Sequence, residues 1–207
     1  MADNISINHK LRLGFLVSHG GSSMRAIVAA IHAGELAAEA RLVVSNNRNC
    51  PALDFARAEG LAWRHISATS EGGAEAADLA IAETMQAAGV ELIVLSGYLR
   101  KLGPRTLERY RGRILNIHPG LLPKYGGQGM YGRRVHEAVL AAGESVSGAS
   151  VHLVDGDYDT GPVIAQQTVQ LLPGDSAEDI ERRVMAAEPG LFVETLRRIS
   201  VGELILP

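Results

Sequence analysis

Residues 11–34 read LRLGFLVSHGGSSMRAIVAAIHAG and contain a short apolar run, a glycine turn and an apolar helical pattern. Residues 11–18 include aromatic and β-branched side chains, which is typical of a buried strand. From Met24 to Ile31 apolar residues recur at helical spacing, and Gly34 can end a helix. The stretch therefore predicts a strand that leads through a glycine turn into a helix.

The same unit recurs through the first half of the chain. Pro51 and Pro104 suit the first turns of helices, and Gly60 and Gly89 suit helix ends. Repeated β-α units of this kind predict an α/β fold with an open, mostly parallel, doubly wound (Rossmann-like) sheet and helices on both faces. Strands are expected at residues 41–46, 61–66, 91–96 and 113–117, and helices at residues 51–60, at residues 74–88 and from Pro104.

The second half of the chain has a different pattern. Residues 119–132, PGLLPKYGGQGMYG, contain two prolines and several glycines and predict a long functional or mobile loop. The strands that follow are expected to form an antiparallel C-terminal extension of the sheet. In chain order the patterns predict a helix over residues 133–142, strands over 148–154 and 162–171, and a helical region over 176–199 that is interrupted at Pro189 and Gly190.

Composition limits the classes of protein. Hydrophobic residues make up 46% and charged residues 21% of the 207 residues, which favours one folded core over disorder. We expect a flexible arm at residues 1–10 and a single domain over residues 11–207. A net charge of −3 argues against a nucleic-acid partner or a polybasic membrane surface. The single cysteine and the polar N-terminus favour a cytoplasmic protein with no membrane association.

The turn at residues 19–23, HGGSS, is a candidate anion site. Glycines between a strand and a helix let the backbone approach a phosphate, and the helix start offers N–H groups with a positive dipole end. The pattern lacks the glycine spacing of dinucleotide-binding proteins and the lysine of a P-loop. Gly21, Ser22 and Ser23 are therefore candidate phosphate-binding residues, and the alternative is a plain serine-capped turn.

Asn116 and His118 lie at the C-terminal end of the strand expected at residues 113–117, His118 directly after it, and are a candidate catalytic pair. Residues two apart in a strand face the same side, so both side chains point into one pocket while Ile117 points into the core. An amide can donate to an oxyanion, and a histidine can carry a proton near neutral pH. The alternative is a polar pair that bonds to the following loop.

The turn at residues 155–161, DGDYDTG, carries carboxylates at alternate positions. It lacks the other ligands of an EF-hand, and no His/Cys cluster has zinc spacing, so we predict no metal. One carboxylate can orient and charge a histidine, although a solvated acidic turn is the commoner case. His152 alternates away from the apolar face of its strand and is expected to be a hydrogen-bonded structural histidine.

Ordered motifs along most of the chain resemble those of the formyltetrahydrofolate-dependent formyltransferases. The most specific signal is NIHPGLLP at residues 116–123, followed by DTGPVI at residues 159–164. Within the family the resemblance is to the enzymes that act on phosphoribosylglycinamide (GAR). The other matching motifs are the GGSS helix opening, VVSNN at 43–47, LSGYLRKL at 95–102 and SVHLVD at 150–155.

The resemblance assigns a role to each matching position. It divides the domain into a phosphate-binding half, residues 11–115, and a catalytic and folate-binding half, residues 116–207. His152 matches a histidine beside the catalytic set. The implied catalytic residues are Asn116, His118 and Asp159; the implied phosphate and ribose contacts are Gly21, Ser22, Ser23 and Glu188; the implied folate contacts are Leu99, Arg100, Lys101, Leu102, Asp155, Gly156, Asp157 and Tyr158.

The implied reaction is transfer of the formyl group of 10-formyltetrahydrofolate to the amine of GAR, a step of purine synthesis. The amine attacks the formyl carbon directly, so neither a covalent enzyme intermediate nor a metal is needed. The partners are then two small molecules, and the protein is a monomer or a homodimer. The alternatives are another amine acceptor such as an amino-sugar nucleotide, a formyltetrahydrofolate hydrolase, and a non-catalytic phosphate- or folate-binding module.

Three positions depart from the family pattern. Ser23 stands where the phosphate loop usually has asparagine, no arginine for the folate tail occurs near Ala74, and Pro189 replaces a histidine after Glu188. These departures leave the formyl-transfer centre intact. They bear on the choice of acceptor and on the contacts of the folate tail.

Overall fold

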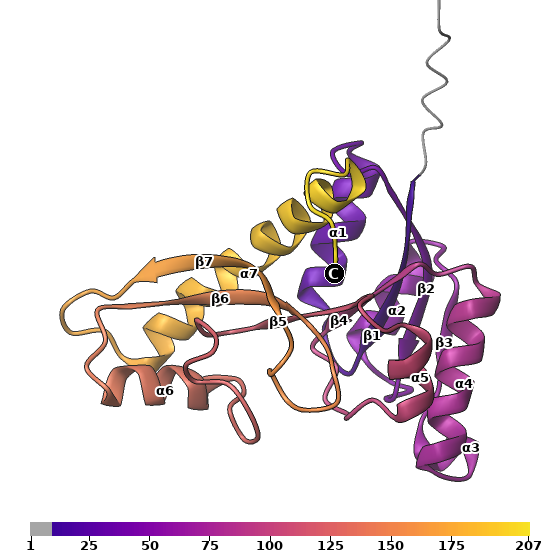
Figure 1. Cartoon of the computed structure of the whole chain (residues 1–207), viewed down its shortest axis with the longest axis horizontal. Helices are drawn as coiled ribbons and strands as arrows, with labels where there is room; N and C mark the ends of the chain where they lie inside the picture. The colour runs from indigo at the N-terminus through magenta and orange to yellow at the C-terminus, as the bar shows by residue number, and fades with distance from the viewer. Residues whose placement is uncertain (1–9) are drawn as a thin grey trace, which may run out of the picture.

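A computed structural model describes residues 10–207, so nearly all of the expected N-terminal arm lies outside the described residues. These residues form a seven-stranded sheet in the order β3-β2-β1-β4-β5-β6-β7 (Figure 1). β1 to β5 are parallel, and β6 and β7 are antiparallel to their neighbours. The strands are β1 Leu11–Val17, β2 Ala38–Ser45, β3 Trp63–His65, β4 Leu92–Ser96, β5 Ile114–His118, β6 Val146–Leu153 and β7 Val163–Gln170.

Helices cover both faces of this sheet, as predicted. α1, α2 and α7 contribute to one buried apolar cluster, and α4 contributes to a second cluster on the opposite face. No helix of the described part of the chain is long and apolar enough to span a membrane. The helices are α1 Ser22–His32, α2 Pro51–Ala58, α3 Ala68–Glu71, α4 Ala74–Ala87, α5 Pro104–Arg109, α6 Arg133–Ala141 and α7 Ala177–Ser200.

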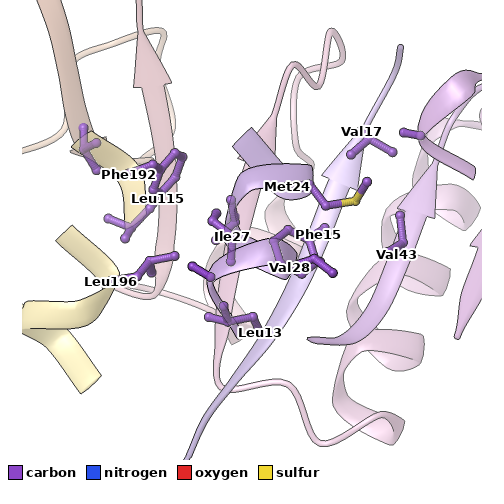
Figure 2. Close-up of a cluster of buried hydrophobic side chains, with 14 of the residues drawn as sticks. Leu13, Phe15, Val17, Met24, Ile27, Val28, Val43, Leu115, Phe192 and Leu196 are labelled. Atoms are coloured by element: carbon purple, nitrogen blue, oxygen red, sulfur yellow. The ribbon is translucent and has the colours of Figure 1, made fainter. Parts of the chain in front are cut away.

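The central strand β1 is buried on both faces because its side chains alternate between the two clusters. Phe15 lies in the first cluster beside Met24 and Ile27 of α1 (Figure 2), whereas Leu16 belongs to the second. Gly14 also faces the second cluster, and a Cβ there would lie 2.5 Å from Sδ of Met85. The missing side chain at Gly14 therefore lets α4 pack closely on β1.

The order of the strands creates a crevice at the carboxyl edge of the sheet. From β1 the chain moves outward to β2 and β3, then returns to place β4 and β5 on the other side of β1. The loops that leave β1 and β4 therefore run in opposite directions. Open α/β sheets bind ligands at such a switch point.

The structure differs from the expected helices at two places. The short helix α3 was not predicted, because a single turn carries no apolar periodicity; it begins at a capping box between Ser67 and Ser70. α7 is continuous through Pro189, where an interruption was expected. Proline removes one backbone hydrogen bond, but the buried faces on both sides of it, including Val184 and Phe192, hold the helix against the sheet.

Candidate active site

The pairing of β5 with β6 brings polar side chains onto one face of the sheet. Asn116 lies opposite His152, and His118 lies opposite Ser150. Directly opposite residues of an antiparallel pair project to the same side. The predicted shared face of Asn116 and His118 is thus joined by His152, whose strand is remote in sequence.

His152 orients the amide of Asn116. Nδ1 of His152 lies 2.9 Å from the carbonyl of Leu153, which can only accept, so Nδ1 carries the proton. Nε2 then accepts a hydrogen bond from Nδ2 of Asn116 at 3.0 Å. This bond uses one of the two hydrogens on Nδ2 and leaves the second available to a ligand.

Asp159 lies between the two histidines. Its Oδ2 is 3.4 Å from Nδ1 of His118, and its Oδ1 is 3.4 Å from Nε2 of His152. The backbone N–H of Gly127 donates to Oδ2 at 3.0 Å. Asp159 has a φ of 58°, a left-handed conformation that tight turns impose. The turn thus presents one carboxylate to both rings.

The loop over residues 119–132 covers His118. Nε2 of His118 donates to the carbonyl oxygen of Tyr125 at 2.8 Å, and the side chain is 3% exposed. The loop is tied to β6 because Ser150 accepts from the N–H of Leu122 and donates to the carbonyl of Gly120. Both ring nitrogens of His118 therefore face acceptors beneath a covering loop.

Burial and charge act in opposite directions on His118. Burial lowers its pKa, and the neighbouring His152 lowers it further, while Asp159 and the carbonyl of Tyr125 raise it; burial prevails. For Asp159, burial alone would raise the pKa, but the hydrogen bond that the protonated form of His152 donates through Nε2, the N–H of Gly127 and the positive charge of the protonated imidazoles hold it below its usual value. Asp159 is thus an anion at neutral pH, beside a histidine whose proton it stabilises.

The glycine turn leads into α1 at the switch point. Gly21 has a φ of 64°, and a Cβ there would lie 3.1 Å from Cε of Met24, so glycine suits the position in both conformation and space. Among the described residues no side chain at the N-cap position caps this helix start. The N–H groups of Ser22 and Ser23 lie in the first turn, where the helix supplies no acceptor. The turn therefore has the geometry of an anion site.

Glu188 lies on α7, which packs beside α1 (Figure 1). Burial raises the pKa of its carboxyl to about 7. Burial is the one cause of this shift, and no neighbouring cation in the described part of the chain lowers the pKa again. Near neutral pH, Glu188 is therefore a half-buried carboxyl poised between its two protonation states.

The two segments that the resemblance assigns to folate contact each other. Nζ of Lys101 lies 3.6 Å from Oδ1 of Asp157 and 5.7 Å from the ring centre of Tyr158. Leu99 is exposed and Leu102 is buried, so the segment after β4 presents both an open and an inward apolar side chain. In residues 10–207 no group of three or more His, Cys, Asp or Glu residues is placed to hold a metal ion.

A cavity of about 920 Å³ lies beside the segment that follows β4, and no sequence pattern predicted it. It is lined by the starts of α4 and α5 and by Arg100, Lys101 and Leu102. Asn116, His118 and Asp159 do not line it. The structure therefore holds a covered polar cluster on β5 and an open cavity on the other side of the segment that follows β4.

Three groups of the site carry no signal in the sequence. These are the carbonyl of Tyr125, the N–H of Gly127 and the hydroxyl of Ser150. Backbone groups are present in every residue, so residue type cannot mark them. Ser150 could have been found only from the strand register that places it opposite His118.

The fold and this polar cluster together define a formyl transferase: the sequence profile of that family matches residues 11–196, and the chain belongs to it. The chain is 34% identical to phosphoribosylglycinamide formyltransferase of Escherichia coli K12, over 91% of this chain and 87% of that one. A crystal structure of glycinamide ribonucleotide transformylase 1 from Symbiobacterium toebii superposes with a TM-score of 0.88 at 34% identity, covering 96% and 92% of the two chains.

A plant relative is longer than this chain. The chloroplastic phosphoribosylglycinamide formyltransferase of Arabidopsis thaliana is 35% identical over 91% of this chain. The match spans 65% of the plant protein.

Proposed function

We propose that this protein transfers the formyl group of 10-formyltetrahydrofolate to the amine of GAR. The family membership and the names of its relatives support this reaction. The observation that carries the proposal is the cluster of Asn116, His118 and Asp159 at the carboxyl end of β5. An amide donor, a titratable imidazole and a carboxylate are the groups that acyl transfer between nitrogens requires.

Asn116 stabilises the oxyanion in this proposal. The primary amine attacks the formyl carbon, and the carbonyl π electrons move onto oxygen to give a tetrahedral intermediate. The second Nδ2 hydrogen of Asn116 donates to that oxygen. Because His152 already holds the first hydrogen, the amide is oriented before the substrate binds.

His118 moves the proton. When the intermediate collapses, the C–N bond to the folate nitrogen breaks, and the imidazolium delivers a proton to that nitrogen. The attacking amine loses one proton in the same sequence, so the overall charge balances. Asp159 stabilises the imidazolium, and the contact between His118 and the carbonyl of Tyr125 gives way when the reactants enter.

The remaining residues hold the two substrates. The N–H groups of Ser22 and Ser23 bind the phosphate of GAR at the turn formed by Gly21. Glu188 accepts hydrogen bonds from the ribose hydroxyls. The folate lies between the segment over residues 99–102 and the turn over residues 155–158, which are already in contact.

An acceptor-dependence assay tests the proposal. The purified protein is mixed with 10-formyltetrahydrofolate, with and without GAR, and the release of tetrahydrofolate is followed. We expect release only with GAR. Equal release without any acceptor would assign a hydrolase. Release with an amino-sugar nucleotide but not with GAR would identify the amino sugar as the formyl acceptor. The departures from the family pattern at Ser23 and Pro189 would then be the first candidates for that change of acceptor.

The proposal extends to the setting of the protein. We propose that it acts in the cytoplasm on these two small molecules as a monomer or homodimer, without a metal and without a nucleic-acid or membrane partner. Size-exclusion chromatography with light scattering measures the oligomeric state.

A further inference from the structure

Two serine hydroxyls cross the switch point between β1 and β4. Ser18 directly follows β1, and Ser96 is the last residue of β4. The two strands pair in parallel, with Val17 opposite Ser96. Both serines are buried, with exposures of 3% and 2%. The hydroxyl of each one bonds to the segment that follows the other strand.

The hydroxyl of Ser96 holds the start of α1. Its Oγ accepts a hydrogen bond from the N–H of Met24 at 3.0 Å, and this bond is buried. The N–H groups in the first turn of an α-helix have no acceptor within the helix itself. Because Ser96 satisfies that of Met24 from β4, the N–H groups of Ser22 and Ser23 remain for a ligand.

The hydroxyl of Ser18 holds the segment that follows β4. Its Oγ accepts a hydrogen bond from the N–H of Leu99 at 2.8 Å and donates to Oδ1 of Asn46 at 2.6 Å. The N–H of Ser18 also donates to the carbonyl of Gly97 at 3.2 Å. Ser18 thus bonds to the backbone at two points where the chain leaves β4 for the segment over residues 99–102.

We propose that Ser18 and Ser96 are positioning residues that act crosswise, each on the substrate bound after the other strand. This inference rests on the proposed function, which places the phosphate of GAR at the turn after β1 and the folate beside the segment after β4. Ser96, which belongs to β4, then orients the phosphate-binding turn. Ser18, which follows β1, orients the segment that contacts the folate.

Removal of either hydroxyl leaves a backbone N–H without its acceptor. In Ser96→Ala this is the buried N–H of Met24, so the first turn of α1 shifts to find another partner. In Ser18→Ala it is the N–H of Leu99, so the segment after β4 loosens. The net contribution of one such bond corresponds to a change of about fivefold in affinity.

The test measures kcat and the KM of each substrate in both alanine variants. We expect Ser96→Ala to raise the KM for GAR about fivefold and the KM for 10-formyltetrahydrofolate less than about twofold. Ser18→Ala should do the reverse. Because neither hydroxyl bonds to the cluster at the end of β5, kcat should stay within about twofold in both variants.

Ser147→Ala is the matched control. Ser147 is a buried serine of β6 whose hydroxyl has no hydrogen-bond partner among the described residues. Its removal takes away a buried hydroxyl but no bond, so both KM values should remain at the wild-type level. Thermal unfolding checks that all three variants are folded at the assay temperature.

Binding is also measured without turnover. Inorganic phosphate probes the turn after β1, and tetrahydrofolate probes the segment after β4, each titrated separately and followed by NMR. We expect Ser96→Ala to weaken only the binding of phosphate and Ser18→Ala to weaken only the binding of tetrahydrofolate, each by about fivefold.

Three results would overturn the inference. The first is an unchanged KM for both substrates in both alanine variants. The second is an equal rise of both KM values in either variant, which would indicate general loosening of the fold. The third is an uncrossed pattern, in which each hydroxyl affects the substrate bound after its own strand. Absence of turnover with GAR in the wild type would count against the proposed function, and the two titrations would still decide the inference.

Discussion

His118 combines features that oppose each other. Both of its ring nitrogens face acceptors, the carbonyl of Tyr125 and Oδ2 of Asp159, so the fully hydrogen-bonded ring is the protonated one. Burial beneath the loop favours the neutral ring and lowers the pKa. A proton held against burial is released readily to a substrate nitrogen, which is what a general acid in this position requires.

Removal of the His118 imidazole should abolish most of the activity. His118→Ala is expected to lower kcat by about 10²- to 10⁴-fold, the usual contribution of a general acid or base. The protein should still fold, as checked by circular dichroism and thermal unfolding. His32→Ala is the control, because that ring is exposed and, within residues 10–207, pairs only with Glu59. Formyl transfer at the wild-type rate by His118→Ala would exclude His118 as the acid.

The pH dependence of kcat should report on Asp159. The acid must be protonated to act, so kcat falls as pH rises through the pKa of His118. Asp159 raises that pKa, and a neutral amide does not. Asp159→Asn should therefore move the descending limb of the kcat profile to lower pH. Asp54→Asn, an exposed carboxylate paired with Arg57, should leave the limb in place. An unmoved limb in Asp159→Asn would indicate that another group supplies the proton.

Side-chain roles were predictable where spacing carries information. The two-residue spacing of Asn116 and His118 in a strand predicted that their side chains share one face of the sheet. The structure confirms this prediction, because both residues pair with β6 two positions apart. The contact of Asp159 with both histidines was not predictable from spacing, because β5 is remote in sequence from β6 and from the turn that follows β6. The resemblance alone linked Asp159 to His118, and the assignment of catalytic roles stays a prediction.

α7 shows how packing overrides local preference. Pro189 has no N–H to donate to the carbonyl of Met185, and Gly190 is a weak helix former, so the sequence favours a break there. Ile180, Val184 and Leu191 are nevertheless buried on one face of a continuous helix. Their burial offsets the local loss, which no reading of residues 189–190 alone could predict.

Gly190 gives a direct test of this helix. A Cβ at Gly190 meets no atom within 4 Å, and its φ lies outside the left-handed region. Gly190→Ala should raise the free energy of unfolding by about 1 kcal/mol, because alanine loses less backbone entropy in a helix. Gly148→Ala is the contrast: its Cβ would lie 2.1 Å from the carbonyl oxygen of Gln167 on β7, so stability should fall. Both are measured by urea unfolding. A loss of stability in Gly190→Ala would contradict the continuous helix.

The strands show the same division between local and distant information. β1 and β4 lie within a residue of their predicted bounds because they are continuous apolar runs. β2 begins at Ala38, three residues earlier than predicted, because it pairs with β1 through residues of mixed polarity. The start of a paired strand depends on its partner, so the hydrophobic pattern of β2 alone cannot predict where β2 begins.

Across the chain, one arrangement explains where chemistry can occur. The switch point between β1 and β4 puts the glycine turn, the segment after β4 and the end of β5 along a single carboxyl edge. The antiparallel strand β6 then brings His152 to that edge. The repeated β-α pattern predicted the edge, whereas the cavity beside it depends on how α3, α4 and the segment over residues 98–105 pack together.

The central claim is that a formyl group passes from folate to the amine of GAR at this edge. It is tested most directly by following the carbon itself. The protein is incubated with 10-formyltetrahydrofolate labelled with ¹³C in the formyl group and with GAR, and the label is located by NMR. We predict that the label moves into the formamide of formyl-GAR, with no free formate formed ahead of it. Label that appears as free formate, or that stays on the folate while GAR is present, would contradict the account.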